Sequence, residues 1–136
     1  MTPPPDSPCP CGRLDARRRP LAFARCCGGY LADFAHVAAP DAESLMRSRY
    51  AAFVLEDADY LLATWHASRR PPEVAFEPGT RWLGLEVRAH RLVDPQHAEV
   101  EFVARSRHAG RAHRLHERSR FVCEDGRWFY VDGDVE

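Results

Sequence analysis

Between residues 42 and 65 the hydrophobic side chains recur every three or four positions, which is the spacing of an amphipathic helix. Asp41 precedes this run and can cap it, because an aspartate carboxylate accepts hydrogen bonds from the free N–H groups of a first helical turn. Asp57 can cap a second, shorter helix in the same way. The pattern predicts two neighbouring helices, the first with Ala42, Leu45, Met46, Arg49 or Tyr50, Phe53 and Val54 on one side, the second with Tyr60, Leu61, Thr64 and Trp65.

The pattern changes after the loop-forming stretch SRRPPEVAFEPGTR, where hydrophobic and polar residues begin to alternate. This alternation is typical of half-buried strands. EDGR makes a hairpin turn into the last strand, WFYVDG. Helices followed by hairpin-linked strands predict an α+β fold, with an antiparallel sheet curled around the helices. The faces predicted to be inward are Leu83, Leu85, Val87 and Ala89 in the first strand, Ala98, Val100, Phe102 and Ala104 in the second, and Leu115, Glu117, Ser119, Phe121 and Cys123 in the third.

Residues 1–30 form a segment of different composition. They are rich in proline, arginine, cysteine and glycine, and they contain too few large apolar side chains to close a core. We therefore expect two parts in this chain of 136 residues, a short element over residues 1–30 and an α+β domain over residues 31–136. Something other than hydrophobic burial must hold the first part together.

Four of the five cysteines lie in this first segment, as the pairs Cys9/Cys11 and Cys26/Cys27. A zinc ion takes four such ligands at tetrahedral corners and can supply folding free energy to a segment without a core. A disulfide framework or a redox dithiol fits less well, because nothing indicates an oxidising compartment and the Cys-x-x-Cys spacing is missing. We expect a structural zinc on these four residues, with no open position for catalysis, whereas Cys123 is expected to be a buried, inert thiol.

Two motifs of this segment, CPCG and CCGGY, resemble the SEC-C motif, a small zinc-binding element found at the C-terminus of the SecA translocation ATPase. The rest of the chain resembles the YchJ family of uncharacterised bacterial proteins. This resemblance implies a nuclear transport factor 2-like (NTF2-like) cone, which agrees with the order of helices and strands. The loop between the cysteine pairs is longer than in the usual SEC-C element. The segments that carry the family resemblance are LMRSRYAAFV, DADYLLATWH, WLGLEV, VEFVAR, ERSRF and GRWFYVDG.

A cone of this kind often encloses a cavity, and polar residues on an otherwise apolar face are the candidates to line it. Glu117 and Ser119 alternate in phase with Phe121, so we expect them to point inward. Because a buried carboxylate needs a partner, we expect Arg49 to pair with Glu117, either as a structural ion pair or as a polar anchor for a ligand. The candidate pocket residues are Arg49, Tyr50, Trp65, His66, Glu117, Ser119 and Trp128, with Tyr60, Trp82 and Tyr130 as further aromatic walls.

His66 follows Trp65 at the end of the second predicted helix. Its imidazole is either a pocket acid or base, or a group that only interacts with the end of the helix. A carboxylate paired to arginine has a lowered pKa and is a poor general base at neutral pH, which weakens a catalytic role for Glu117.

The charge balance gives no global attraction to nucleic acid or to an anionic membrane, since the formal net charge is -1. Local arginine clusters could still contact RNA, a ribosome or an acidic protein surface, although such clusters are also common on solvated faces. The two clusters are Arg13, Arg17, Arg18, Arg19 and Arg25 in the first segment, and Arg105, Arg107, Arg111, Arg114, Arg118 and Arg120 on two consecutive strands.

The sequence contains no serine–histidine–aspartate set, HExxH motif, phosphate-binding loop or dinucleotide fingerprint. It therefore favours a non-enzymatic zinc-binding protein that contacts other proteins; the alternative is a small-molecule binder or an enzyme that uses Glu117, Ser119 and His66. It lacks the pattern of a secretory signal and any apolar run of the roughly 20 residues that cross a bilayer. We expect a cytoplasmic protein without a membrane partner, and nothing in the sequence indicates an oligomeric state.

Overall fold

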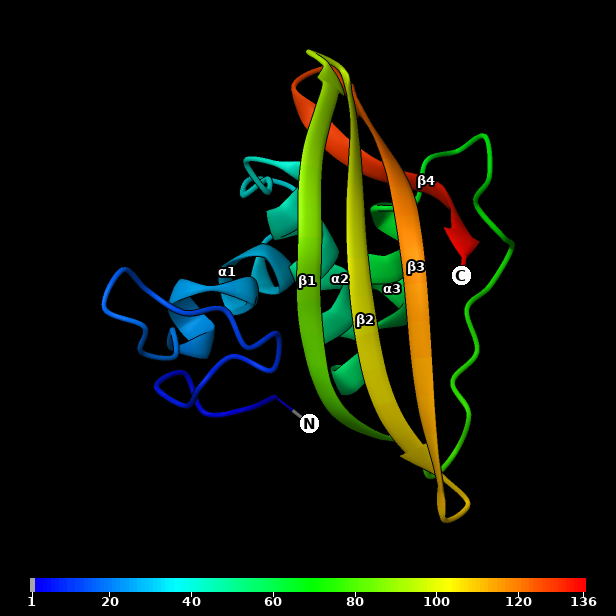
Figure 1. Cartoon of the computed structure of the whole chain (residues 1–136). Helices are drawn as coiled ribbons and strands as arrows, with labels where there is room; N and C mark the ends of the chain where they lie inside the picture. The colour runs from blue at the N-terminus through cyan, green and yellow to red at the C-terminus, as the bar shows by residue number, and fades with distance from the viewer. Residues whose placement is uncertain (1) are drawn as a thin grey trace.

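The computed structural model describes residues 2–136 as a four-stranded antiparallel sheet with helices on one face (Figure 1). The strands follow one another in chain order, so each is joined to the next by a short turn. This is the predicted α+β arrangement of helices first and a curled antiparallel sheet afterwards. The strands are β1 (Arg81–Asp94), β2 (His97–His108), β3 (Arg111–Glu124) and β4 (Arg127–Val135), and the helices are η1 (Phe23–Arg25), α1 (Cys27–Ala32), α2 (Ala42–Leu55) and α3 (Ala58–Ala63).

The two predicted helices, α2 and α3, begin at the predicted caps. The Asp41 carboxylate accepts a hydrogen bond of 2.7 Å from the Ser44 backbone N–H, and the Asp57 carboxylate accepts one of 3.0 Å from the Tyr60 N–H. α2 ends at Glu56, which has a left-handed conformation with φ of 56°. Between these ends, α2 lies behind the sheet in Figure 1 and contacts β1, β2 and β4.

The inner face of β2 supplies most of the sheet's contribution to the core. Ala98, Val100, Phe102 and Ala104 are all buried, as their alternation predicts. They pack against Leu45, Met46 and Tyr50 of α2, so the sheet curls around this helix.

The inner face of β1 differs from the prediction because two bulges interrupt the alternation. The register shifts between Trp82 and Gly84 and again between Val87 and Ala89. An extra residue in one strand reverses which side chains face inward after it. Leu83 is therefore 49% exposed and Ala89 is exposed, whereas Trp82, Leu85 and Val87 pack against the core.

The cysteine-containing segment packs against α2. Phe23 and three of its cysteines belong to the same buried cluster as Leu45 and Met46. Two arginines add polar contacts, since Arg13 Nη1 donates to Ser44 Oγ at 2.8 Å and Arg47 Nη1 donates to the Cys11 carbonyl oxygen at 3.1 Å. No helix in residues 2–136 is long and apolar enough to cross a membrane.

We expect Asp41→Ala to lower the free energy of unfolding by about 1 kcal/mol at pH 7, because the cap of α2 is lost. Burial by itself would raise the pKa of Asp41, but the hydrogen bonds from Ser44 outweigh it and hold this pKa below its ordinary value. A carboxylate with a lowered folded-state pKa stabilises the fold above the unfolded pKa of about 3.9, and loses that effect as the pH falls through the folded value.

Urea unfolding of both proteins between pH 7 and pH 3 measures this difference, which should shrink below about pH 4. Asp41→Asn is the matched control and should retain most of the stability, since asparagine also caps helices well. An alanine variant as stable as the wild type at pH 7 would contradict the assignment of Asp41 as the cap.

Candidate functional site

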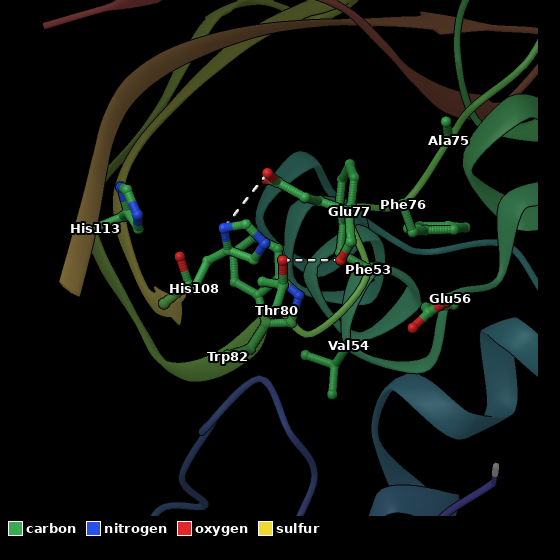
Figure 2. Close-up of a pocket in the computed structure, with 11 residues that line it drawn as sticks. Phe53, Val54, Glu56, Ala75, Phe76, Glu77, Thr80, Trp82, His108 and His113 are labelled. Carbon is green, nitrogen blue, oxygen red and sulfur yellow. Dashed lines mark hydrogen bonds and ion pairs between the residues drawn. The ribbon is translucent and has the colours of Figure 1, made fainter. Parts of the chain in front are cut away.

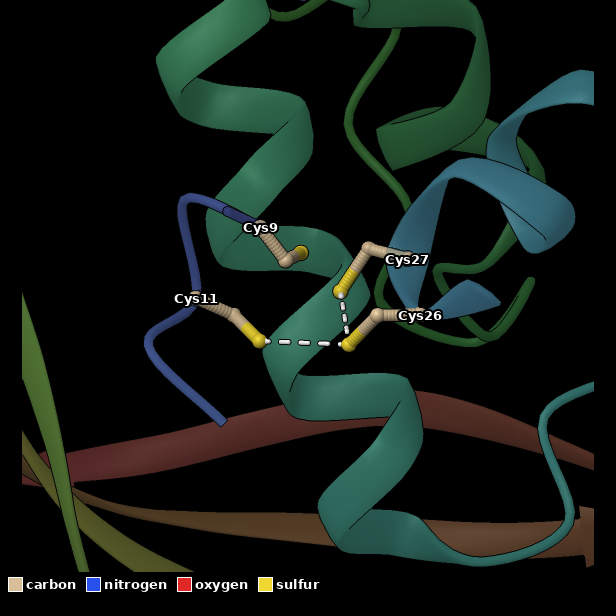
Figure 3. A group of neighbouring side chains, drawn as sticks. All are labelled: Cys9, Cys11, Cys26 and Cys27. Atoms are coloured by element: carbon tan, nitrogen blue, oxygen red, sulfur yellow. Dashed lines mark hydrogen bonds between the residues drawn. The ribbon is translucent and has the colours of Figure 1, made fainter. Parts of the chain in front are cut away.

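The four cysteines of the first segment come together in one cluster (Figure 3). Their Sγ atoms all lie within 4.8 Å of one another, with 3.6 Å between Cys11 and Cys26 and 3.9 Å between Cys26 and Cys27. Tetrahedral ligands with metal–sulfur distances of about 2.3 Å are separated by roughly 3.8 Å. The cluster therefore fits a metal ion, and none of the cysteines described in residues 2–136 forms a disulfide.

Local backbone geometry brings the two cysteine pairs together. Cys9 and Cys11 lie on a turn that continues through Gly12, whose φ of 75° is left-handed. Cys26 and Cys27 lie at the start of α1, directly after η1. Gly28 is required here by a close approach, because a Cβ atom at this position would lie 2.7 Å from the Phe23 carbonyl oxygen.

The electrostatics of the cluster also favour a cation. Hydrogen bonds from the thiols of Cys26 and Cys27 lower the pKa of Cys11 far below its ordinary value. The same contacts with Cys11 raise the pKa values of Cys26 and Cys27, so one thiolate makes its neighbours harder to ionise. A divalent cation would remove this conflict, because metal coordination allows all four groups to be thiolates.

The long loop between the cysteine pairs is ordered by Asp15. Its carboxylate accepts hydrogen bonds from the Arg17 and Arg19 backbone N–H groups at 2.8 and 3.0 Å. Arg18, at the tip, has a left-handed φ of 62°. The side chains of this arginine run are exposed, so the loop presents positive charge to solvent.

A second candidate site is a cavity of about 320 Å³ between α2 and the inner face of the sheet. Its size is within the range of small-molecule sites. Most of its wall is aromatic or aliphatic, with one arginine and one glutamate as the charged groups. The lining residues are Met46, Arg49, Tyr50, Phe53, Trp65, Trp82, Phe102, Ala104, Leu115, Glu117, Ser119, Phe121 and Tyr130.

Five of the seven predicted pocket residues lie in this wall, namely Arg49, Tyr50, Trp65, Glu117 and Ser119. The expected ion pair between Arg49 and Glu117 does not form, since no oxygen of Glu117 lies within 4.0 Å of an Arg49 nitrogen among the described residues. Tyr130 connects the two instead. Its ring lies 4.6 Å from the guanidinium carbon of Arg49, and its hydroxyl donates to Glu117 Oε2 at 3.2 Å.

His66 and Trp128 do not line this cavity. The chain after α3 pairs with β4 through a bridge between Trp65 and Tyr130, and successive side chains of an extended segment point to opposite sides. Trp65 faces the cavity, so the His66 ring points away from it and contacts Glu124 at 2.7 Å and Ser68 at 2.6 Å. Trp128 is opposite Cys123 in the sheet and packs against the main core.

Of the further aromatic walls, Trp82 and Tyr130 line the cavity and Tyr60 does not. Tyr60 belongs to a separate cluster with Leu61, and its hydroxyl is 2.6 Å from Ser48 Oγ. Cys123, expected to be buried, is only half-buried. Phe102, Ala104 and Leu115 also line the cavity, although the sequence predicted them only as inward-facing side chains of their strands.

A second, more open pocket of about 360 Å³ lies beyond Phe53 and Trp82, which also belong to the wall of the cavity (Figure 2). His108 Nδ1 lies 3.4 Å from Glu77 Oε1, and Thr80 Oγ1 donates to the Glu77 carbonyl oxygen at 3.0 Å. Figure 2 shows His113 apart from these groups, on the neighbouring strand. Glu77 thus contacts both His108 and Thr80, whereas His113 takes no part in these contacts.

Three of the six arginines clustered on the last strands pair with acidic residues. Arg105, Arg118 and Arg120 pair with Glu86, Glu136 and Asp132 at 3.7, 3.5 and 2.6 Å. A further acidic group with one histidine, Glu101, His116 and Glu136, has ligand atoms within 4.8 Å of one another. Because Arg118 already pairs with Glu136, we assign this group to the ion pairs of a mixed-charge surface.

Comparison with known proteins agrees with both parts of this geometry. The family model described as "YchJ, middle NTF2-like domain" matches residues 41–133. A "UPF0225 protein" of Polaromonas sp. is 71% identical over 132 residues, which cover 96% of this chain and 95% of that protein. Another UPF0225 protein, from Bordetella parapertussis, is 56% identical over 140 residues, which cover 99% of this chain and 99% of that protein.

Two solved structures share the fold across both parts. The solution structure of a SEC-C motif containing protein from Rhodopseudomonas palustris has a TM-score of 0.79 and 32% identity, and the match covers 96% of this chain and 99% of that chain. A crystal structure of a SEC-C motif containing protein from Psychrobacter arcticus also has a TM-score of 0.79, with 31% identity, 97% of this chain and 84% of that chain. The chain therefore belongs to the YchJ family of UPF0225 proteins, which join a SEC-C motif to an NTF2-like domain.

Proposed function

We propose that this protein is a non-enzymatic binding protein that holds a small molecule in the cavity of its NTF2-like domain, with a structural zinc ion in the four-cysteine cluster. The observation that carries this proposal is the cavity itself, about 320 Å³ with a mainly aromatic and aliphatic wall. This raises the small-molecule alternative above the protein-contact hypothesis, because the space left between helix and sheet is large enough for a ligand.

The donor set supports zinc as the metal. Four thiolates at tetrahedral spacing are typical of structural zinc sites, and they leave no coordination position for a water nucleophile. The cluster is also packed into the core beside α2, where it can stabilise the fold. Because none of its cysteines lines the cavity, it would not contact a ligand bound there.

The environment of Glu117 supports binding over catalysis. Its Oε2 atom accepts hydrogen bonds from Ser119 Oγ at 2.6 Å and from the Tyr130 hydroxyl at 3.2 Å. Both donors occupy Oε2, the oxygen that would otherwise be available to take a proton from a substrate. His66, the other candidate for proton transfer, binds Glu124 outside the cavity wall.

Native mass spectrometry should find one zinc ion in each wild-type chain and none in the variant Cys26→Ser/Cys27→Ser. Acidification should release the ion, because protons compete with zinc for the thiolates. Cys123→Ser is the matched control and should keep the metal, since Cys123 lies outside the cluster. A double variant with its full zinc content, or a metal-free wild type with the mass of a disulfide-bonded chain, would contradict this assignment.

The cavity can be tested with a neutral apolar dye, N-phenyl-1-naphthylamine, whose fluorescence rises in apolar surroundings. Ala104 is buried in the wall, so Ala104→Leu should fill part of the space and weaken dye binding by about tenfold, the effect of roughly 1.4 kcal/mol. Ala112→Leu adds the same volume at an exposed position outside the cavity wall and should leave binding unchanged. Thermal melts check that both variants fold, and equal dye binding by Ala104→Leu and the wild type would remove the cavity site.

A second candidate function is contact with an acidic protein surface through the loop between the cysteine pairs. The exposed side chains of Arg17, Arg18 and Arg19, on a loop that Asp15 holds in one shape, favour it. A rigid loop loses less conformational entropy on binding than a mobile one does.

Replacement of these three arginines by serine should weaken binding to an immobilised poly-glutamate peptide by about tenfold, if each contact contributes roughly 0.5 kcal/mol. The zinc-loaded protein is used throughout, with Arg105→Ser/Arg107→Ser as the control on the sheet. Equal binding by the loop variant would exclude this candidate, and tighter binding to single-stranded RNA than to the peptide would favour a nucleic acid in its place.

A further inference from the structure

Arg49 is a charged residue inside the cavity wall, and no carboxylate of residues 2–136 forms an ion pair with it. Only 6% of its surface is exposed, and burial lowers its pKa to about 10, so the guanidinium is still cationic at neutral pH. Its Nη1 atom donates to the Leu61 carbonyl oxygen at 2.8 Å and to Thr64 Oγ1 at 2.7 Å. Trp65 and Tyr130 stack on the same group, with 5.1 and 4.6 Å from its central carbon to the ring centroids.

Within residues 2–136, the other edge of the guanidinium forms no hydrogen bond. An arginine has five N–H donors, and the two on Nη1 are occupied, so those on Nε and Nη2 remain. Among the described residues, no side-chain nitrogen or oxygen that is sealed from solvent lacks a hydrogen-bond partner. The Nε and Nη2 atoms must therefore adjoin accessible space, and Arg49 lines the cavity.

Glu117 is held away from this edge. Ser119 and Tyr130 both donate to its Oε2 atom, and its side chain lies so close to Gly133 that a Cβ atom there would clash with it. The carboxylate thus contributes to the local charge balance without occupying the free edge of Arg49. This arrangement leaves the Nε and Nη2 donors of Arg49 as a buried, fork-shaped pair that can donate hydrogen bonds to a bound ligand.

The shape of that fork matches a carboxylate. The Nε and Nη2 hydrogens of arginine are parallel, and a carboxylate accepts both in a bidentate pair that is stronger than hydrogen bonds between neutral groups. The remaining wall is suited to a flat ring, because Tyr50, Trp82 and Phe102 line it together with aliphatic side chains. The volume of about 320 Å³ limits the ligand to a small molecule.

We propose that the cavity binds a small aromatic carboxylate, whose carboxylate accepts hydrogen bonds from Nε and Nη2 of Arg49 and whose ring packs among Tyr50, Trp82 and Phe102. This inference rests on the proposed function, since it names the ligand class of the same cavity. Glu117 restricts the ligand by repelling a second negative charge and by offering its Oε1 atom to a hydrogen-bond donor.

The test compares benzoate with benzamide, which have nearly the same shape and differ in charge. Both are titrated into the full-length, zinc-loaded protein, and binding is followed by calorimetry and by the NMR signals of the Arg49 Nε–H group and the tryptophan side chains. Benzoate should bind about tenfold more tightly or better, because hydrogen bonds to an ionised group contribute roughly 1.5–3 kcal/mol.

Two variants test whether Arg49 and Glu117 cause the preference for benzoate. Arg49→Lys keeps the positive charge but removes the two parallel N–H donors. It should weaken benzoate binding by about tenfold and leave the affinity for benzamide nearly unchanged. Glu117→Gln removes the nearby negative charge with little change of shape, so benzoate should bind more tightly to it than to the wild type. If Arg49→Lys does not fold, the pair of ligands and Glu117→Gln still decide the question.

The outcomes separate this inference from the proposed function. If benzoate and benzamide bind equally, or if neither binds while the naphthylamine dye does, the cavity is a binding site and the carboxylate inference is wrong. If neither these ligands nor the dye binds, both the inference and the proposed function are overturned.

Discussion

The burial of α2 is the constraint on which the other parts of this protein depend. Nine of the residues in this helix are buried, and three of them are polar. Each polar side chain needs a partner in a neighbouring element: Ser44 binds Arg13 of the first segment, whereas Ser48 and Arg49 bind Tyr60 and the carbonyl of Leu61, both in α3. Because unsatisfied buried polar groups are costly, these contacts set the orientation of α2 against the first segment and α3 at once.

The same helix connects the metal centre to the cavity. Arg47 and Arg49 are two positions apart, and successive helical residues turn by about 100°, so their side chains leave the helix on nearly opposite sides. Arg47 contacts the carbonyl of Cys11, and Arg49 lines the cavity. The cysteine segment is thus part of the core that supports one wall of the cavity, and a metal ion there would stiffen that wall without taking part in any chemistry inside it.

The outer face of the sheet follows a different rule from the inner face. Arginines there meet carboxylates from neighbouring strands, as Arg120 does with Asp132 and Asp134 at 2.6 and 2.8 Å. Such exposed pairs contribute little to stability, but they neutralise part of a surface that the arginine content alone would make basic. The loop around Arg18 also presents positive charge, because Asp15 binds backbone N–H groups there and the arginine side chains face solvent.

Several features were predictable from the sequence because they depend on neighbours along the chain. Helix caps at Asp41 and Asp57, the alternation of β2 and the pairing of cysteines each follow from local spacing. The bulges of β1 were not predictable, since a bulge is decided by how two strands fit together and leaves the composition of the strand unchanged. Leu83 therefore lies outside although its spacing placed it inside.

The amino-acid sequence by itself determined the elements, their order and the residue types available to a metal or a ligand. Only the tertiary structure decided which charged groups meet. Arg49 and Glu117 belong to elements far apart in the chain, and Tyr130, from a third element, lies in contact with both. The bridge between Trp65 and Tyr130 likewise turns His66 away from the cavity. Local spacing along the chain predicts which side of its own helix or strand a residue occupies. Whether one edge of a buried guanidinium is left without a partner depends on packing between elements, and a local sequence pattern does not contain that information.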